Sequence, residues 1–541
     1  MKKNSTIRSL ERKAHDGSVK SAFQLYEYYS IGKFVDKDLI VVKKYYDSVC
    51  GAIKGASLKV SSIVLKNFRG FVDLRVDFSS DIENRNVIVF SGPNGVGKTT
   101  ILGAVSKSLS WISYRIGSPK STGEYIDFHD IYHSSSHATI IANVILGREH
   151  FQIDLSKSSL DSSVQKTGVL TEFSLLSDIY RHLNSDDVQF NLPLIAFYGV
   201  ERAVEVSSKD EKIEDVFGDG GQEKFDGYKK SLTGHADFKL FFKWFKYHQD
   251  IINADKKISF EEINSISNEV QQLILMIEKN DEKTSSVSFL QKILSDKRQR
   301  LDWLNSKVES TNNDLSERLV KVVTNAITEF LPGFTNFRIQ YKPVMGMTVE
   351  KNGVALSVLQ LSQGEKSLLA LVADIARRLV LLNPSLADPC QGVGIVMIDE
   401  IDLHLHPIWQ QNIISKLSSV FPNVQFLITT HSPQVLSTVS RDCIRILEVN
   451  EVGVGVANIP NAYTYGEPSN NVMQSVMGVD PQPPVPEKLL LDELTLLVDQ
   501  GEFDSDRARM LFAELKQRLS NKHPQLQRID RSIRRQKALS Q

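Results

Sequence analysis

The sequence has few cysteines, no long apolar run and almost no net charge. Its three cysteines, Cys50, Cys390 and Cys443, are far apart and odd in number, and none has the spacing of metal ligands. We therefore expect a reducing compartment, the cytoplasm. No run of about 18 apolar residues occurs, and the charged N-terminus has no apolar core, so we expect neither a membrane span nor secretion. A net charge of −1 over 541 residues favours no class of partner.

The strongest local pattern is a glycine-rich run after the apolar residues 87–90. The run Gly92-Pro-Asn-Gly-Val-Gly-Lys98-Thr99 matches G-x-x-x-x-G-K-[ST]. Such glycines let backbone N–H groups and a helix N-terminus converge on phosphate oxygens. We predict that Lys98 neutralises the β- and γ-phosphates and that Thr99 holds Mg²⁺. The residues predicted to bind the nucleotide are Asn94, Gly95, Val96, Gly97, Lys98, Thr99 and Thr100.

Two adjacent acids, Asp399 and Glu400, end another apolar run, 394–398. Asp399 is a predicted Mg²⁺ ligand, and Glu400 is predicted to orient an attacking water. Successive side chains of a strand point to opposite faces, so both acids can serve one site only if the chain leaves the strand here. That predicts a position at the carboxyl edge of a sheet. His431 follows a third apolar run, 424–430, and is predicted to contact a γ-phosphate; a purely structural histidine is the alternative.

The spacing of apolar residues changes several times along the chain between helix-like and strand-like patterns, which predicts five segments. The first has the spacing of one tetratricopeptide-like helix hairpin, which cannot bury its own apolar face. It is either a partner-docking module or a helical cap on the main domain. Alternating strands after it predict an α/β fold. The predicted segments are a tetratricopeptide-like region over 1–55, an N-terminal lobe over 56–205, a helical arm over 206–330, a C-terminal lobe over 331–465, and a linker with C-terminal helices over 466–541.

The arm and the tail are predicted from helical periodicity. Ser259-x-x-Glu262 is a capping-box signature that predicts a helix start, and a near-heptad apolar stripe follows over 290–330. We predict an antiparallel arm of about 30–60 Å whose stripe packs internally rather than recognising a partner. The tail is basic and fits either a phosphate-binding surface or a solvated helix end. Its basic residues are Arg528, Arg531, Arg534, Arg535 and Lys537.

The run Leu361-Ser-Gln-Gly-Glu-Lys366 resembles the signature motif of the ATP-binding-cassette (ABC) superfamily. The resemblance implies an α/β fold with an ABC-type P-loop ATPase head. It also implies a homodimer that sandwiches ATP between two heads, because in that superfamily the motif contacts the nucleotide of the other subunit. The residues that this resemblance assigns to ATP binding are Ser362, Gln363, Gly364 and Glu365.

The distance between the phosphate loop and the signature-like motif, together with two further sequence runs, indicates which branch of the ABC superfamily the chain resembles. Thr99 and Ser362 are 263 positions apart, more than in a transporter cassette and far fewer than in long-armed chromosome-maintenance ATPases. Residues 65–71 and 399–407 resemble RecF-like and OLD-family ATPases. Asp402, which the resemblance places at the nucleotide, departs mildly from the usual D-E-P-E-x-x-L-H-P, as does the preceding isoleucine.

Two histidines in the same run, His404 and His406, leave two readings open. They could hold a metal or contact the partner of a dimer. No third ligand lies nearby in the sequence, which favours the dimer contact.

Over about residues 57–541 the chain is most similar to the PtuA ATPases of Septu anti-phage systems, in particular those encoded with type I-A retrons. The tetratricopeptide-like start points to the retron branch. We expect a slow or regulated ATPase that is not itself a nuclease. The resemblance implies an HNH nuclease partner, PtuB-like, and for the retron form a reverse transcriptase and its multicopy single-stranded DNA.

Three other functions are alternatives. A RecF-like repair ATPase would bind duplex DNA through local basic patches. An OLD-like nuclease would need strand-borne acids for two-metal cleavage, and none is apparent in the predicted helices after residue 465. A scaffold that binds ATP without hydrolysing it is disfavoured because Glu400 is present.

Overall fold

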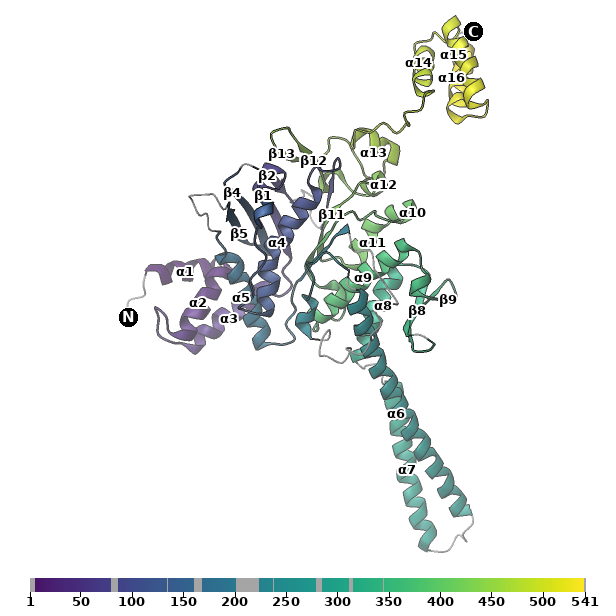
Figure 1. Cartoon of the computed structure of the whole chain (residues 1–541). Coiled ribbons are helices and arrows are strands. Elements are labelled where there is room, and N and C mark those ends of the chain that lie inside the picture. The colour runs from purple at the N-terminus through teal and green to yellow at the C-terminus, as the bar shows by residue number, and fades with distance from the viewer. Residues whose placement is uncertain are drawn as a thin grey trace. The chain divides into compact units, whose positions relative to one another are not determined.

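The structure is a computed structural model that describes residues 5–78, 86–133, 135–159, 168–200, 223–236, 238–278, 285–310, 315–343 and 345–539. The chain divides into two compact units, Met1–Glu467 and Pro468–Gln541 (Figure 1). The finer division into five segments stays a prediction.

A six-stranded sheet forms the centre of the first unit, in the order β13-β12-β3-β11-β10-β6. Its strands pair in parallel, except that β13 runs antiparallel to β12. Every residue of β3, β10 and β11 is buried, which explains why these runs are apolar throughout instead of alternating. The strands are β3 (Val87–Ser91), β6 (Leu194–Tyr198), β10 (Gly394–Ile398), β11 (Val424–Thr429), β12 (Ile444–Val449) and β13 (Gly455–Asn458).

Two smaller sheets are antiparallel. One has the order β2-β1-β4-β5 and the other the order β7-β8-β9. Their strands are β1 (Leu58–Phe68), β2 (Phe71–Asp77), β4 (His137–Leu146), β5 (Glu149–Ser158), β7 (Phe334–Gln340), β8 (Gly346–Lys351) and β9 (Val354–Ser357). From Leu74 to Asp77 buried and exposed residues alternate along β2, as expected for a sheet with one face on the core.

Helices complete the first unit, and the expected α/β class is confirmed (Figure 1). The helices α4 and α9 pack against the central sheet. Nearly every residue of α9 from Ser367 onward is buried, so this helix lies inside the unit. The helices outside the arm and the N-terminal region are α4 (Lys98–Gly117), α5 (Thr171–Asp186), α8 (Leu315–Phe330), α9 (Gln363–Leu382), α10 (Pro407–Gln410), α11 (Ile413–Val420) and α12 (Pro433–Leu436).

The arm is the hairpin of α6 (Phe238–Glu278) and α7 (Ser285–Ser310), shown in Figure 1. The helix start predicted at Ser259 is wrong, because α6 passes through this position without interruption. Within the arm Ile266 and Val270 are buried against apolar residues of both helices, so the predicted internal packing is confirmed there. Ion pairs from Arg300 to Glu262 and from Lys297 to Glu269 join the two helices across the hairpin.

The N-terminal region has three helices, one more than a single hairpin: α1 (Ser5–His15), α2 (Val19–Ile31) and α3 (Leu39–Ile53). Ser18 caps α2 and donates to Glu149 Oε1 at 3.1 Å, while Lys20 Nζ lies 2.8 Å from Glu172 Oε1. These contacts attach the helices to β5 and α5. The segment therefore packs on the rest of the first unit, as the helical-cap alternative predicts, while a role in partner docking stays a prediction.

The second unit has four helices within its described residues: α13 (Ser469–Ser475), α14 (Lys488–Asp499), α15 (Asp506–Leu519) and α16 (Pro524–Leu539). Leucines of α14 and α15 pack with Leu526 and Ile529 of α16 into a small apolar core.

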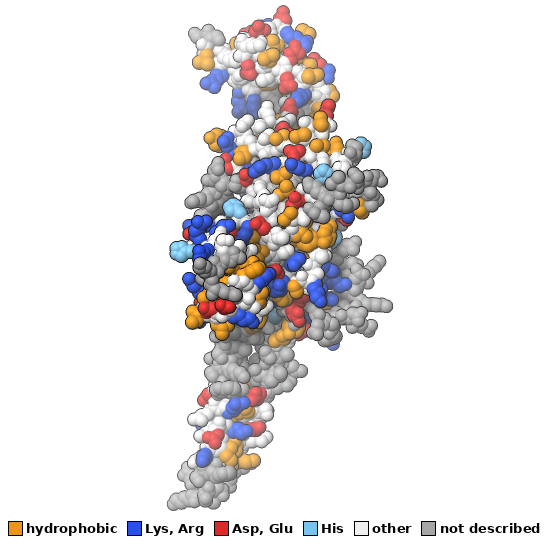
Figure 2. All heavy atoms as spheres, turned by 90° about the vertical axis from the view of Figure 1, so that its left-hand side faces the viewer, with side chains coloured by type: hydrophobic (Ala, Val, Ile, Leu, Met, Phe, Trp, Pro, Cys, Tyr) orange, Lys and Arg blue, Asp and Glu red, His pale blue; other side chains and the backbone are white. Residues whose placement is uncertain are grey.

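Neither unit contains, among its described residues, a helix with the length and apolar composition that a bilayer crossing requires. Acidic and basic side chains are interspersed over much of the face drawn in Figure 2.

Candidate active site

The glycine-rich run forms the loop between β3 and α4. Gly97 has φ +99°, and a Cβ there would lie 2.3 Å from Cζ of Phe71, so the path of this loop excludes other residues. Gly92 is similarly constrained, since a Cβ would lie 2.7 Å from the carbonyl oxygen of Leu447. No side chain caps α4, which begins at Lys98. The first N–H groups of this helix are therefore arranged as in an anion site.

Lys98 is buried and folds back over the loop. Its Nζ donates to the carbonyl oxygens of Gly92 and Pro93, each at 2.9 Å. Burial lowers the pKa of Lys98, and the nearby charges of Glu400 and Asp399 oppose that effect. The amine is thus held on the loop, and the acids are near enough for their charges to affect its pKa.

Thr99 and Asp399 meet at the carboxyl edge of the central sheet. Thr99 Oγ1 donates to Asp399 Oδ2 at 2.8 Å, and Thr429 Oγ1 donates to Asp399 Oδ1 at 2.6 Å. A hydroxyl and a carboxylate are hard oxygen ligands, and Mg²⁺ in nucleotide sites typically takes one or two such protein ligands beside phosphates and waters. The donor set therefore fits the predicted metal.

Glu400 confirms the predicted departure from the strand. β10 ends at Ile398, and Glu400 has φ +46°, a left-handed conformation that is uncommon outside glycine. The Glu400 N–H donates to Thr429 Oγ1 at 2.7 Å. The turn brings the backbone of both acids to one edge of the sheet, as the sequence argument required.

The segment after β11 is held by Asp402. Thr430 Oγ1 donates to Asp402 Oδ1 at 2.5 Å, and the His431 N–H lies 3.4 Å from the same oxygen. Asp402 thus contacts its own chain next to His431. Ile401, one of the two departures from the D-E-P-E-x-x-L-H-P pattern, is 1% exposed, which accounts for an apolar residue at that position.

The signature-like residues begin α9. Ser362 and Glu365 form a reciprocal capping box, with Glu365 Oε2 accepting from the Ser362 N–H at 3.0 Å. Burial disfavours ionised Glu365, but hydrogen bonds from Lys351 and Ser362 outweigh it and hold the pKa of Glu365 below its ordinary value. A Cβ at Gly364 would lie 2.5 Å from the carbonyl oxygen of His404, so this helix start packs closely on the turn after the acids.

The predicted residues therefore form two groups. Lys98, Thr99, Asp399, Glu400 and the His431 segment lie together at the carboxyl edge of β3, β10 and β11. Across the described residues no hydrogen bond or ion pair joins the signature-like residues 362–365 to the loop 92–99.

The histidine pair has structural contacts. His406 caps α10, its ring accepting from the Ile408 N–H at 3.3 Å. His404 has φ +62° and supplies the carbonyl that Gly364 approaches. No group of three or more His, Cys, Asp or Glu side chains in the described part of the chain is arranged to hold a metal.

Two contacts of the site were missed from the sequence. Thr429 bonds to Asp399 and to Glu400, but within an apolar run it looked like an ordinary β-branched strand residue. Its place at the end of that run, beside another predicted strand end, was the available signal. No sequence signal pairs Phe71 with Gly97.

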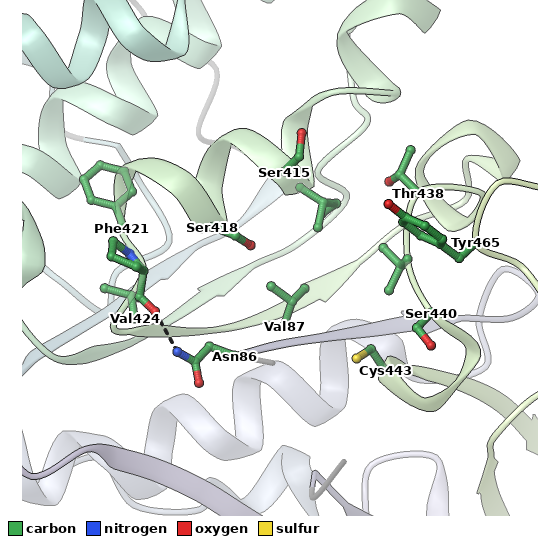
Figure 3. Close-up of a pocket in the computed structure, with 13 residues that line it drawn as sticks. Asn86, Val87, Ser415, Ser418, Phe421, Val424, Thr438, Ser440, Cys443 and Tyr465 are labelled. Carbon is green, nitrogen blue, oxygen red and sulfur yellow. Dashed lines mark hydrogen bonds between the residues drawn. The ribbon is translucent and has the colours of Figure 1, made fainter. Parts of the chain in front are cut away.

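A separate pocket of about 330 Å³ lies elsewhere on the sheet (Figure 3). Its lining includes Val87 and Val424, the first residues of β3 and β11, and Asn86, whose side-chain amide donates to Pro422. It therefore lies at the amino edge, whereas the predicted nucleotide residues lie at the carboxyl edge.

This combination of sheet, phosphate loop and inserted helical arm defines the fold of an ABC-type P-loop ATPase head. A family model described as "AAA ATPase domain" matches residues 58–436. The chain is 36% identical over 524 residues to "Retron Ec83 probable ATPase" of Escherichia coli, which covers 95% of this chain and 94% of that protein. It is 34% identical over 512 residues to "Retron Vc95 probable ATPase" of Vibrio cholerae serotype O1 biovar El Tor, covering 92% and 95%. The chain therefore belongs to the AAA ATPase domain family and, within it, to the family of these retron ATPases.

Two further matches are partial or distant. "Septu protein PtuA" of Bacillus mycoides (strain KBAB4) is 41% identical over 91 residues, which are 17% of this chain and 12% of that protein. The Smc head domain with an extended coiled coil from Pyrococcus furiosus is 13% identical, covers 74% of this chain and 96% of that chain, and has a TM-score of 0.36. The assignment to retron ATPases is thus supported, while the narrower ones, to PtuA and to type I-A retrons, stay predictions.

Proposed function

We propose that this chain hydrolyses ATP in a retron or Septu-type anti-phage system, that ATP closes two copies into a homodimer, and that the dimer regulates a partner nuclease. The observation that carries the proposal is the contact between Thr99 and Asp399 at the sheet edge, beside buried Lys98. The relatives named as retron ATPases, similar over nearly their whole length, support the defence context.

In this mechanism the backbone of residues 92–99 and the Lys98 amine hold the triphosphate. Thr99 and Asp399 hold Mg²⁺, which neutralises phosphate charge when bound. Glu400 orients the attacking water, and His431 contacts the γ-phosphate. Thr429 keeps Asp399 and Glu400 in place through its hydroxyl, since it bonds to both residues.

The dimer brings residues 362–365 of one copy to the ATP of the other. This arrangement is supported by the capping box that fixes the start of α9 and by the lack of described bonds from these residues to their own phosphate loop. The test measures mass in solution for Glu400→Gln, which should bind ATP without hydrolysing it. We expect a dimer with ATP and a monomer with ADP.

A second variant, Ser362→Arg in the Glu400→Gln background, places a bulky charge at the proposed contact and should abolish the dimer while ATP still binds. An ATP-bound Glu400→Gln protein that stays monomeric would contradict the dimer, and so would an unchanged dimer in the double variant.

The proposed partners are a PtuB-like HNH nuclease and, in a retron system, a reverse transcriptase with multicopy single-stranded DNA, all in the cytoplasm. The chain itself is proposed to be a slow or regulated ATPase and not a nuclease. The described residues of the second unit contain helices and irregular connections but no strand, so they offer no strand-borne acids for two-metal cleavage.

The test of this part is purification of the tagged chain from its native operon with ATP and Mg²⁺, followed by identification of the bound proteins and nucleic acids. Recovery of an HNH protein is expected. A chain recovered alone as a homodimer would favour the RecF-like alternative, and DNA cleavage by the purified chain would favour the OLD-like one.

A further inference from the structure

The exposed side of the last helix, α16, carries a cluster of arginine side chains. The helix carries five basic residues and one acidic residue, Asp530, and therefore a net charge of +4. Its apolar side is used within the unit, since Leu526 and Ile529 are 1% and 7% exposed and belong to the core that α14 and α15 complete. All five basic side chains are exposed.

The cations of this helix differ in their partners. Arg534 Nη2 lies 2.7 Å from Asp530 Oδ2, and Lys537 Nζ lies 2.8 Å from Asp504 Oδ1. Both charges are therefore partly neutralised by carboxylates of the same unit. Three other arginines form no ion pair with any described residue. They are Arg528, Arg531 and Arg535, hereafter the arginine triad.

The triad lies on one face, because its members are spaced i, i+3 and i+7 along a helix. At 1.5 Å per residue the three Cα positions span about 10 Å, close to three steps of a nucleic-acid strand at about 3.4 Å each. The guanidinium fork donates two hydrogen bonds to phosphate oxygens, which a lysine ammonium cannot do in the same plane. We propose that the arginine triad binds the phosphodiester backbone of a nucleic acid.

Two other anionic surfaces fit less well. A helix that lies on a membrane inserts a free apolar face, and the apolar face of α16 is already buried in the core of its unit. An acidic protein partner would be expected to bury apolar residues at the centre of the contact. On this face Gln527 and Ser532 are polar, and the one large exposed apolar side chain described there, Leu539, lies at the last residue of the helix, away from the middle of the triad.

The arginine triad contains no residue of the proposed ATP site. Nucleic-acid binding by the triad can therefore be tested separately from ATP hydrolysis. The test measures fluorescence anisotropy of labelled 20-nucleotide probes with the full chain: single-stranded DNA, duplex DNA and single-stranded RNA, each at several salt concentrations. The triple variant R528Q/R531Q/R535Q should bind at least tenfold more weakly than the unaltered chain. Its slope of log affinity against log salt should fall by about 2 to 3, since each lost phosphate contact removes about 0.7 to 0.9.

A matched control is R507Q/R509Q/R518Q on α15, which removes the same charge from arginines that have carboxylate partners in Glu493, Asp504 and Glu514. It should change affinity less than about threefold, because those cations are already paired. R528K/R531K/R535K keeps the charge and should retain most of the salt slope. Thermal melting by circular dichroism verifies folding; if the triple variant does not fold, R531Q alone should lose two- to fivefold.

The relative affinities for the three probes identify which nucleic acid is preferred, and preference for any of them supports the proposal. Equal losses in the triad and control variants would overturn it, as would an unaltered chain that binds no probe at low salt. Triad-dependent binding to phosphatidylglycerol vesicles without binding to the probes would also overturn it, in favour of a membrane surface.

Discussion

Thr99 and Asp399 lie 300 positions apart in the sequence, yet the Thr99 hydroxyl donates to the Asp399 carboxylate at 2.8 Å. Thr99 lies in the first turn of α4, which follows β3, and Asp399 directly follows β10. In the central sheet β11 lies between β3 and β10. Parallel strands place both at the same edge, because their carboxyl ends point the same way. That edge is where open α/β sheets bind ligands.

The hydrogen bond between Thr99 and Asp399 predicts what happens when the Thr99 hydroxyl is removed. Thr99→Ala deletes both the bond to Asp399 and a proposed Mg²⁺ ligand, so ATP hydrolysis should fall by about 10²-fold or more. Thr99→Ser keeps the hydroxyl and should stay within about tenfold of the unaltered rate. Phosphate release across a Mg²⁺ titration measures both variants. A Thr99→Ala protein with unaltered rate and Mg²⁺ dependence would exclude the proposed metal site.

Gly97 predicts a steric effect on the phosphate loop. Gly97→Ala places a methyl group 2.3 Å from the Phe71 ring at φ +99°, which costs about 1–2 kcal/mol in backbone strain besides the clash. ATP binding should weaken by more than tenfold. Gly103→Ala lies inside α4, the helix that Gly97 precedes. Apart from the adjacent backbone of the helix itself, no atom lies within 4 Å of the new methyl group, so this variant should be neutral or stabilising by up to about 1 kcal/mol. Equal ATP affinity of the two variants, measured by calorimetry, would contradict this explanation.

A buried charge cluster under the central sheet predicts a large loss of stability. Asp374, Arg377 and Arg378 are fully buried, and Asp374 bonds to both guanidinium groups at 2.8 Å. Burial alone would raise the pKa of Asp374, but the two arginines outweigh it and hold that pKa below its ordinary value. Tyr198 donates to the same carboxylate at 2.9 Å.

Asp374→Asn leaves two buried cations without their counter-charge, so the free energy of unfolding should fall by about 3–5 kcal/mol. Tyr198→Phe removes one hydroxyl and leaves the ion pairs intact, so a loss of about 0.5–1.5 kcal/mol is expected. Urea unfolding followed by tryptophan fluorescence measures both, since Trp111 and Trp244 are buried in the same unit. Similar losses in the two variants would show that the cluster does not depend on the carboxylate charge.

Glu365 predicts a dependence of stability on pH. Its pKa is lower in the folded chain than in the unfolded chain, so ionised Glu365 stabilises the fold above the ordinary carboxyl pKa. This contribution disappears as the pH falls through the lowered folded value. The difference in free energy of unfolding between the unaltered chain and Glu365→Gln should therefore be constant near neutral pH and shrink below about pH 4.5.

Lys351→Met, which removes the cation 2.7 Å from Glu365, provides the control. It should reduce the same pH-dependent difference, because the lowered pKa of Glu365 depends partly on that ion pair. A difference that does not change with pH would rule out the ionised carboxylate as its source.

Elements with a strong local signal were predicted correctly from the sequence. The apolar run 394–398 is a fully buried strand, and the two acids after it lie beyond its end, because a strand alternates its side chains and a single site cannot use both faces. The helices of the arm were predicted from periodicity, but the helix start at Ser259 was wrong. The S-x-x-E pattern at Ser259 occurs inside a helix, and a local capping signal does not determine whether a helix has already begun.

The sequence by itself determined the phosphate loop, the acids after the buried strand, the helical tail and the α/β class, since each follows from residue spacing over a few positions. Only the tertiary structure decided that Thr429 holds Asp399 and Glu400, that Phe71 lies against Gly97, and that the arginine triad has no ion pair among the described residues. These relationships join positions far apart in the chain or depend on which neighbours a helix acquires. Spacing along the sequence cannot specify them, because they arise only when the sheet order and the packing of the helices are set.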